Sequence, residues 1–176
     1  IVIAVLITLF VILTILVTTG NIAWYDNFFI NHIRNITDTK TSIFKILTSF
    51  GDWFILVPLS LLSIILIKNK KYGIYITFNL IIATIINTLL KLFFVRERPF
   101  DSLVIETGYS YPSGHSFVSL AFYGFLIYLI IKSNFSKNIK YLWSGILIIL
   151  IALIGISRIY LGVHFPSDVL GGFIAA

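Results

Sequence analysis

The chain of 176 residues is 59% hydrophobic and only 11% charged. This composition excludes an ordinary soluble globular domain, in which about a quarter of the residues are charged, and it indicates an integral membrane protein. The formal net charge is +6, but the basic residues lie in short loops and polar patches rather than in one long stripe. We therefore expect an anionic lipid or phosphate, and no nucleic acid, as the partner. The absence of cysteine excludes disulfides and thiolate metal sites.

Apolar runs of bilayer length predict an all-α fold, a polytopic membrane helix bundle that forms one domain over residues 1–176. About six transmembrane helices are expected, the sixth incomplete in this chain. The run 1–19 is uncharged and longer than the roughly 7 to 15 apolar residues of a signal-peptide core, so it predicts a spanning helix rather than a cleaved leader. The expected spans are 1–19, 54–67, 72–95, 113–131 and 141–156, then 169–176, which is too short to cross, so we expect the natural chain to continue.

A short interfacial helical segment is expected after the first span. Trp24 and Tyr25 mark a membrane–water interface, where these residue types are enriched. The polar residues that follow are interspersed with apolar ones, which predicts a helix along the membrane surface; the apolar residues are Phe28, Phe29, Ile33 and Ile36. His32 falls in this segment, and we interpret it as an interfacial histidine outside any site.

Lysine-rich loops predict the orientation, because cytoplasmic loops collect basic residues. Two short loops qualify, one with Lys68, Lys70 and Lys71 and the other with Lys132, Lys137 and Lys140. About 24 to 28 Å of helix separates these loops from three polar patches, which is close to the thickness of a bilayer core. We therefore expect the three patches to meet at the outer face of the membrane, which would be the cytoplasmic membrane if the source is a bacterium.

The three patches carry ionisable side chains at the edges of apolar runs. They are KLFFVRERP at 91–99, SYPSGH at 110–115 and SRIYLGVHFPSD at 157–168. Such side chains are expensive near a membrane core and usually mark a functional site.

Lys91 and Arg98 are seven residues apart, so both would project from one face if the helix over 72–95 continued to Arg98. Two cations on one face suit a phosphate. The alternative is snorkelling, in which long basic side chains extend to the headgroups. We favour snorkelling for Arg96 and a local ion pair for Glu97.

The second patch predicts an anion cradle. Pro112 is placed as the first residue of a helix, so the free amides that follow, at Ser113 and Gly114, could point at a phosphate. The alternative is a simple turn and helix start. Ser113 is not a hydrolase nucleophile of the usual kind, because its neighbours do not form a Gly-x-Ser-x-Gly elbow.

The third patch places His164 four residues before Asp168. The carboxylate could accept from one imidazole nitrogen and leave the other free as a nucleophile, although such a pair taken alone is more often structural. A zinc site is disfavoured, because the chain has three histidines and no carboxylate cluster accompanies His115 and His164.

Taken together, the patches resemble the three signature motifs of the type-2 phosphatidic acid phosphatase superfamily, which also contains lipid phosphate phosphatases, some soluble acid phosphatases and vanadium haloperoxidases. All three match without a gap and in the family's order; the one small departure is Tyr111, where relatives often have Phe. The matching residues are Lys91, Arg98 and Pro99; Pro112, Ser113, Gly114 and His115; and Ser157, Arg158, His164 and Asp168.

The resemblance implies a metal-independent phosphatase with no cofactor. His164, expected at the rim of the site, would attack phosphorus to give a phosphohistidine, held in register by Asp168. His115 would protonate the leaving oxygen and later activate water. The phosphate-binding groups implied by the resemblance are Lys91, Arg98, Ser113, the Gly114 amide and Arg158.

The expected substrate is a membrane lipid phosphate, and three cations favour a diphosphate. Undecaprenyl diphosphate is the first hypothesis, with phosphatidylglycerol phosphate, diacylglycerol diphosphate and phosphatidic acid as alternatives. A lipid phosphotransferase stays open as a rival enzyme. A haloperoxidase is disfavoured by the apolar spans, and a non-enzymatic lipid carrier would not require His115, His164 and Asp168 together. No obligatory protein partner is evident.

Overall fold

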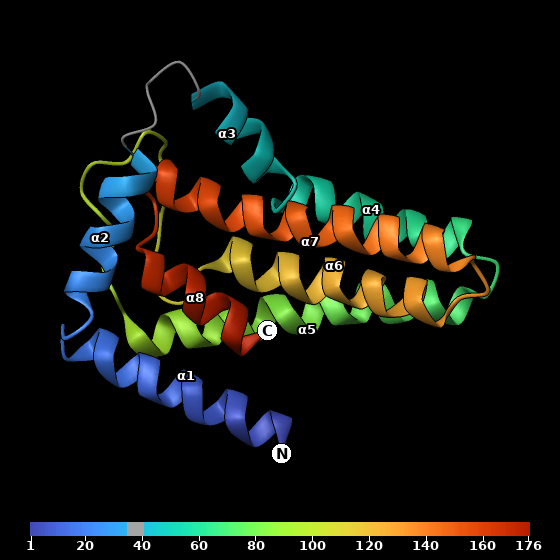
Figure 1. Ribbon diagram of the computed structural model, residues 1–176, viewed down its shortest axis with the longest axis horizontal. Helices are drawn as coiled ribbons and strands as arrows, with labels where there is room; N and C mark the ends of the chain where they lie inside the picture. The colour runs from blue at the N-terminus through green and yellow to red at the C-terminus, as the bar shows by residue number, and fades with distance from the viewer. Residues whose placement is uncertain (35–40) are drawn as a thin grey trace.

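The computed structural model describes residues 1–34 and 41–176, and within these ranges it contains helices and no strand (Figure 1). The helices are α1 (Val2–Thr18), α2 (Ala23–Arg34), α3 (Thr41–Ser49), α4 (Trp53–Leu66), α5 (Lys70–Phe94), α6 (Gly114–Lys132), α7 (Lys137–Tyr160) and α8 (Pro166–Ala175). The prediction of an all-α fold is confirmed.

A long bundle of α4, α5, α6 and α7 dominates the molecule, with consecutive helices packed side by side (Figure 1). Within residues 1–34 and 41–176, four stretches are long and apolar enough to cross a membrane, namely 41–66, 70–94, 114–132 and 137–160, and the bent pair α1 and α2 would make a fifth. The prediction of a polytopic membrane bundle is therefore confirmed. The ten residues of α8 within this chain span about 15 Å, which is about half the thickness of a bilayer core.

The N-terminal helices cover one end of the bundle. Helix α1 packs against α8. The chain bends by 89° between α1 and α2, and α2 packs against α7 and α8 (Figure 1). The predicted interfacial segment corresponds to α2, which begins earlier than expected; Ile36 lies outside the described residues. Helix α3, which packs on α7, was not predicted.

Three helix boundaries differ from the prediction. Helix α5 ends at Phe94 because Val95 adopts a left-handed conformation with φ 52°, so the argument that Lys91 and Arg98 share a helical face is wrong. Pro112 is not the first helical residue either, because Ser113 is the N-cap of α6. Helix α7 continues to Tyr160, so the third patch begins inside a helix.

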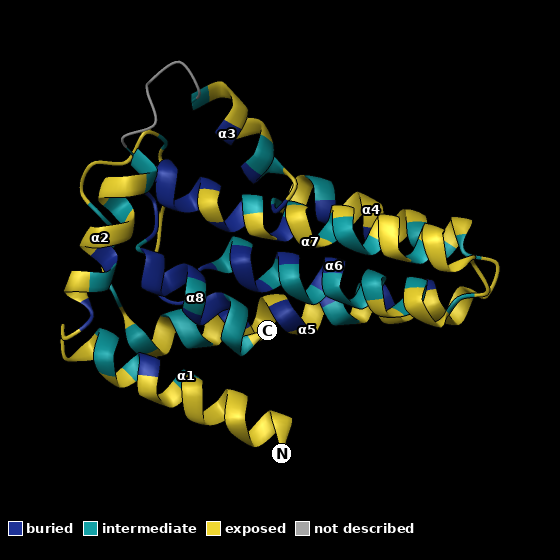
Figure 2. Cartoon of the chain, viewed as in Figure 1, coloured by how far each residue is buried: buried dark blue, intermediate teal, exposed yellow. Residues whose placement is uncertain are grey.

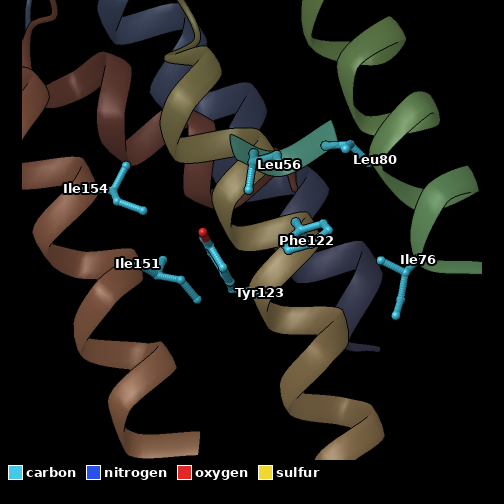
Figure 3. Packing of buried hydrophobic residues seen from close by; sticks show 7 residues of the cluster. All are labelled: Leu56, Ile76, Leu80, Phe122, Tyr123, Ile151 and Ile154. Atoms are coloured by element: carbon cyan, nitrogen blue, oxygen red, sulfur yellow. The ribbon is translucent and has the colours of Figure 1, made fainter. Parts of the chain in front are cut away.

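Burial is concentrated at the end of the bundle where α6, α7 and α8 meet, whereas the outer faces of the long helices are exposed and apolar, as lipid contact requires (Figure 2). An apolar cluster between α4, α5, α6 and α7 holds the middle of the bundle together (Figure 3); its buried members are Leu56, Ile76, Leu80, Phe122, Tyr123, Ile151 and Ile154. Among the most buried large side chains are Arg158, His164 and Asp168. These ionisable side chains therefore lie in the most buried part of the protein.

Candidate active site

The three polar patches meet at one end of the bundle. The C-terminal ends of α5 and α7 and the N-terminal ends of α6 and α8 lie there, and the α4–α5 and α6–α7 connections that carry the lysines lie at the opposite end (Figure 1). The patches contact one another directly: among these contacts, Arg98 Nη1 lies 3.2 Å from His164 Nε2, and the Ser113 amide donates to the Asp168 carbonyl at 2.9 Å. The expected convergence is present.

The contacts of His164 define which ring nitrogen is free to attack. A guanidinium can only donate, so Nε2 beside Arg98 must accept with its lone pair, and the proton of the neutral ring sits on Nδ1. Nδ1 lies 3.5 Å from Asp168 Oδ2, which is an ion-pair distance but too long for a good hydrogen bond. The nucleophilic lone pair therefore points to the cationic side of the site.

His164 is 2% exposed, so the expectation that it sits at the rim of the site is wrong. It lies in the loop between α7 and α8. Burial, followed by the nearby charges of Arg158, Lys91 and Arg98, holds the pKa of His164 well below its usual value. The ring is therefore neutral near pH 7, as a nucleophile must be.

Asp168 is held in place by two donors. The Phe165 amide donates to Oδ2 at 2.8 Å, and Arg96 Nη1 donates to Oδ1 at 2.6 Å. Arg96 also donates through Nη2 to Oδ2 of Asp26, which is 3% exposed, at 2.9 Å. The snorkelling interpretation of Arg96 is therefore wrong, because this side chain joins two buried carboxylates.

Asp26 belongs to α2 and was missed by the sequence analysis. It also accepts from the amide and the hydroxyl of Ser167, both at 2.8 Å. A carboxylate among the aromatic residues of a predicted interfacial helix was the one signal that could have found it. Glu97, expected to form a local ion pair, has none within the described residues.

Lys91 and Arg98 come together through a loop rather than along a helix. Lys91 Nζ donates to the carbonyl of Tyr109 at 2.5 Å. Arg98 donates to the carbonyls of Gly108 and Thr107, both at 3.0 Å, and through Nη1 to that of Val163 at 2.9 Å. The α5–α6 loop thus folds back over both cations and fixes their positions.

Arg158 and Glu106 form an ion pair on the cationic side. Arg158 is 2% exposed; its Nη1 donates to Thr48 Oγ1 at 2.7 Å, and its Nη2 pairs with Glu106. Glu106 also lies 3.9 Å from Arg98. Burial raises the pKa of Glu106, but the charge and hydrogen bond of Arg158, together with the charges of His115 and Arg98, outweigh burial, and the net shift of the pKa is downward. An internal anion, missed by the sequence analysis, therefore bridges the two arginines expected to bind phosphate.

The start of α6 faces the same cations. Ser113 is fully buried and caps the helix, and its Oγ accepts from Ser116 Oγ at 3.0 Å. A Cβ on Gly114 would lie 3.1 Å from Asn87 Oδ1 and 3.6 Å from Lys91 Cε, so glycine allows α5 to approach closely. The first amides of a helix have no partner within it, so they are available to an anion beside Lys91.

His115 lies beside an apolar cavity. Its Nε2 forms a 2.7 Å hydrogen bond with Asp52 Oδ1, a residue that the sequence analysis did not single out. His115 and Asp52 line a cavity of about 260 Å³ whose walls are largely apolar and come from α4, α5 and α6; they include Leu56, Val57, Leu80 and Val118. The site thus has a cationic half around His164 and an apolar half next to His115.

Comparison with known proteins finds a matching family and several relatives. A family model described as the PAP2 superfamily matches residues 72–176. The chain is 42% identical over 94 residues to phosphatidylglycerophosphatase B of Bacillus subtilis, 29% over 144 residues to an undecaprenyl-diphosphatase of Sulfolobus acidocaldarius, and 30% over 156 residues to undecaprenyl-diphosphatase BcrC of Bacillus subtilis. These alignments cover 51%, 77% and 84% of this chain but only 45%, 65% and 73% of the relatives.

Two solved structures share the fold. A transmembrane PAP2-type phosphatidylglycerolphosphate phosphatase from Bacillus subtilis superposes with a TM-score of 0.89 and 29% identity, covering 98% of this chain and 89% of that one. LpxE of Aquifex aeolicus gives a TM-score of 0.67 and 26% identity, covering 82% and 86% of the two chains.

Proposed function

The chain belongs to the PAP2 superfamily, and from this premise we propose that it is a membrane-integral lipid phosphatase that removes a terminal phosphate through a phosphohistidine. One observation carries the proposal: a buried, neutral His164 directs the lone pair of Nε2 at the Arg98 guanidinium, 3.2 Å away. A phosphoryl group bound to that guanidinium would lie within reach of the lone pair.

In the first step, the phosphoryl oxygens bind the cationic half of the site and His164 Nε2 attacks phosphorus. The N–P bond forms as the bond from phosphorus to the leaving oxygen breaks. Asp168 stabilises the positive charge that develops on the imidazole, and preorganised donors stabilise the charge on the oxygens. Those donors are Lys91, Arg98, Arg158, Ser113 and the Gly114 amide.

His115 is the general acid of the first step and the general base of the second. It gives a proton to the leaving oxygen in the first step, and in the second it takes a proton from the water that attacks the phosphohistidine. The N–P bond then breaks, inorganic phosphate leaves, and His164 returns to its neutral form. No step requires a metal ion, so activity in EDTA is part of the proposal.

A lipid substrate is supported by the cavity next to His115. Its apolar walls suit the chain of a lipid leaving group, and the exposed apolar faces of the helices keep the site in contact with the bilayer. The relatives named undecaprenyl-diphosphatase, together with three cations at the site, favour undecaprenyl diphosphate. A site facing outward from a bacterial cytoplasmic membrane fits this assignment, because the lysine loops lie at the other end of the bundle.

Phosphate release by the purified protein in detergent tests the proposal. The substrates are undecaprenyl diphosphate, phosphatidylglycerol phosphate, diacylglycerol diphosphate and phosphatidic acid at matched concentrations, and His164→Gln is the control. We expect kcat/KM for undecaprenyl diphosphate to exceed kcat/KM for each of the other three lipids by more than about tenfold, which corresponds to about 1.4 kcal/mol of differential transition-state binding. A higher kcat/KM for one of the glycerolipids would overturn the isoprenoid assignment. Release of phosphate from none of the four lipids would overturn the assignment as a lipid phosphatase.

A further inference from the structure

The turn segment from Thr48 to Asp52, which joins the last residues of α3 to the start of α4, contributes two side chains to the site, although it lies outside residues 72–176, which match the family model. Thr48 Oγ1 accepts from Arg158 at 2.7 Å, and Asp52 Oδ1 lies 2.7 Å from His115 Nε2. The three motifs contain neither residue. The turn is therefore a fourth element of the site.

The turn is built to hold this position. Gly51 donates to the Thr48 carbonyl at 2.8 Å, and the hydroxyl of Tyr123 on α6 donates to the Phe50 carbonyl at 2.7 Å. A Cβ on Gly51 would lie 2.9 Å from His115 Cδ2, so only glycine allows the turn to approach the ring this closely. The distance between the turn and His115 is thus set by packing on both sides.

Asp52 occupies the N-cap position of α4 but does not cap the helix. An N-cap aspartate usually accepts from the amide of the second or third helical residue. Here the side chain makes no such bond and instead meets His115. Its carboxylate is therefore used for a contact across the site rather than for the local stability of α4.

We propose that Asp52 is the charge partner of the general acid. Its carboxylate accepts a hydrogen bond from the Nε2–H group of His115, so Nδ1 is the nitrogen that donates a proton to the leaving oxygen. Asp52 itself does not touch the substrate, so it is a positioning residue. The inference rests on the proposed function, because it assigns a role within that reaction.

The charges around His115 support this assignment. The groups that face it are Asp52 from α4, Arg158 from α7 and Glu106 from the α5–α6 loop, and His164 is also near. Arg158 opposes a positive ring, and the carboxylate of Glu106 is already paired with Arg158. Asp52 is therefore the carboxylate that stabilises the imidazolium directly.

The proton balance follows from this contact. In the first step the imidazolium carries protons on both nitrogens, and the Nδ1 proton moves to the leaving oxygen as the P–O bond breaks. The neutral ring keeps its proton on Nε2, which donates a hydrogen bond to Asp52, so the lone pair is at Nδ1. In the second step the same nitrogen takes a proton from the attacking water, and the imidazolium is restored.

Leaving-group dependence tests the inference. The alkoxide that leaves phosphatidic acid needs a proton, whereas the nitrophenolate that leaves p-nitrophenyl phosphate does not. We expect Asp52→Asn to lower kcat/KM, which reports the first phosphoryl transfer and not the shared hydrolysis of the phosphohistidine, roughly 10- to 100-fold on phosphatidic acid, part of the 10²- to 10⁴-fold that a general acid contributes, and by less than about threefold on the aryl ester. Asp52→Glu should recover part of the loss, and Asp101→Asn, a pair partner of Arg34 at the surface, is the matched control. Equal losses on both substrates, or no loss, would overturn the inference.

A second measurement needs no turnover. ¹⁵N NMR of the imidazoles reports which nitrogen of neutral His115 carries the proton, and the chain has only three histidines to assign. We expect the Nε2–H form in the wild type and a mixture of both forms in Asp52→Ala. An Nδ1–H form in the wild type would overturn the inference. If the wild type released no phosphate from any lipid, the proposed function would fail while this measurement still decided the role of Asp52.

Discussion

Arg96→Met should be strongly damaging, although Arg96 is neither one of the catalytic residues nor one of the phosphate-binding groups. The guanidinium donates to Asp168 at 2.6 Å, to Ser167 Oγ at 2.8 Å and to Asp26 at 2.9 Å, and it lies 4.2 Å over the Phe165 ring. The carboxylates of Asp26 and Asp168 are 4% and 0% exposed. The substitution therefore leaves two buried negative charges without their cation.

Removing one partner of a buried ion pair costs about 3–5 kcal/mol, and here one guanidinium serves two carboxylates. A loss of that size is a large part of the roughly 5–15 kcal/mol that stabilises a typical protein. Turnover should fall as well, because Asp168 loses a donor that holds it beside His164. Arg96→Lys should be intermediate in both stability and turnover, because an ammonium keeps the positive charge but lacks the planar set of donors that bonds to both carboxylates.

Thermal unfolding in detergent, followed by tryptophan fluorescence, and phosphate release measure the two effects. Arg34→Met is the matched control: it also removes an arginine from an aspartate pair, but its partner Asp101 is 72% exposed, so the cost should be at most about 1 kcal/mol. Adding Asp26→Asn to Arg96→Met should restore part of the stability, because one uncompensated charge is removed. If Arg96→Met were as stable and as active as Arg34→Met, the role assigned to Arg96 would be refuted.

Three further predictions concern the anion site, the nucleophile and the topology. Glu106→Gln should make vanadate bind about tenfold or more tightly, because the internal anion no longer competes for Arg158 and a charge-assisted hydrogen bond is worth about 1.5–3 kcal/mol; an unchanged inhibition constant would contradict this. The acid limb of kcat/KM should lie well below pH 6.5, because a group with a lowered pKa stays deprotonated to lower pH; a limb from His164 near the ordinary value of about 6.5 would contradict it. Ser102→Cys should react with an impermeant maleimide on intact cells and Asn69→Cys should not, and the reverse labelling would invert the orientation.

Hydropathy and fixed spacings made much of this protein predictable. The apolar runs gave the long helices because each must satisfy its own backbone in lipid. The three motifs could be placed at one end of the bundle because helix length and the lysine loops define depth. Even so, the convergence of Lys91 and Arg98 was expected for the wrong reason: a left-handed Val95 ends the helix, and the following loop brings Arg98 back.

The missed residues reach the site through contacts that no local sequence pattern predicts. Asp26 and Asp52 sit on α2 and at the start of α4, more than 60 residues from the partners they meet, and only the packing of these helices brings them there. Glu106 lies in a loop whose path depends on carbonyls that accept from Arg98. A sequence pattern reports what one element needs, whereas these contacts depend on several elements at once.

Trapping the covalent intermediate tests the central claim most directly. The purified protein is mixed in EDTA with a lipid diphosphate that carries ³²P in its terminal phosphate, quenched during turnover, and analysed for label bound to protein. We expect label that is stable to alkali and lost in acid, as for phosphohistidine; it should be absent in His164→Gln and longer-lived in His115→Gln, where water is no longer activated. Turnover of the wild type without bound label, or label that persists in His164→Gln, would contradict the account.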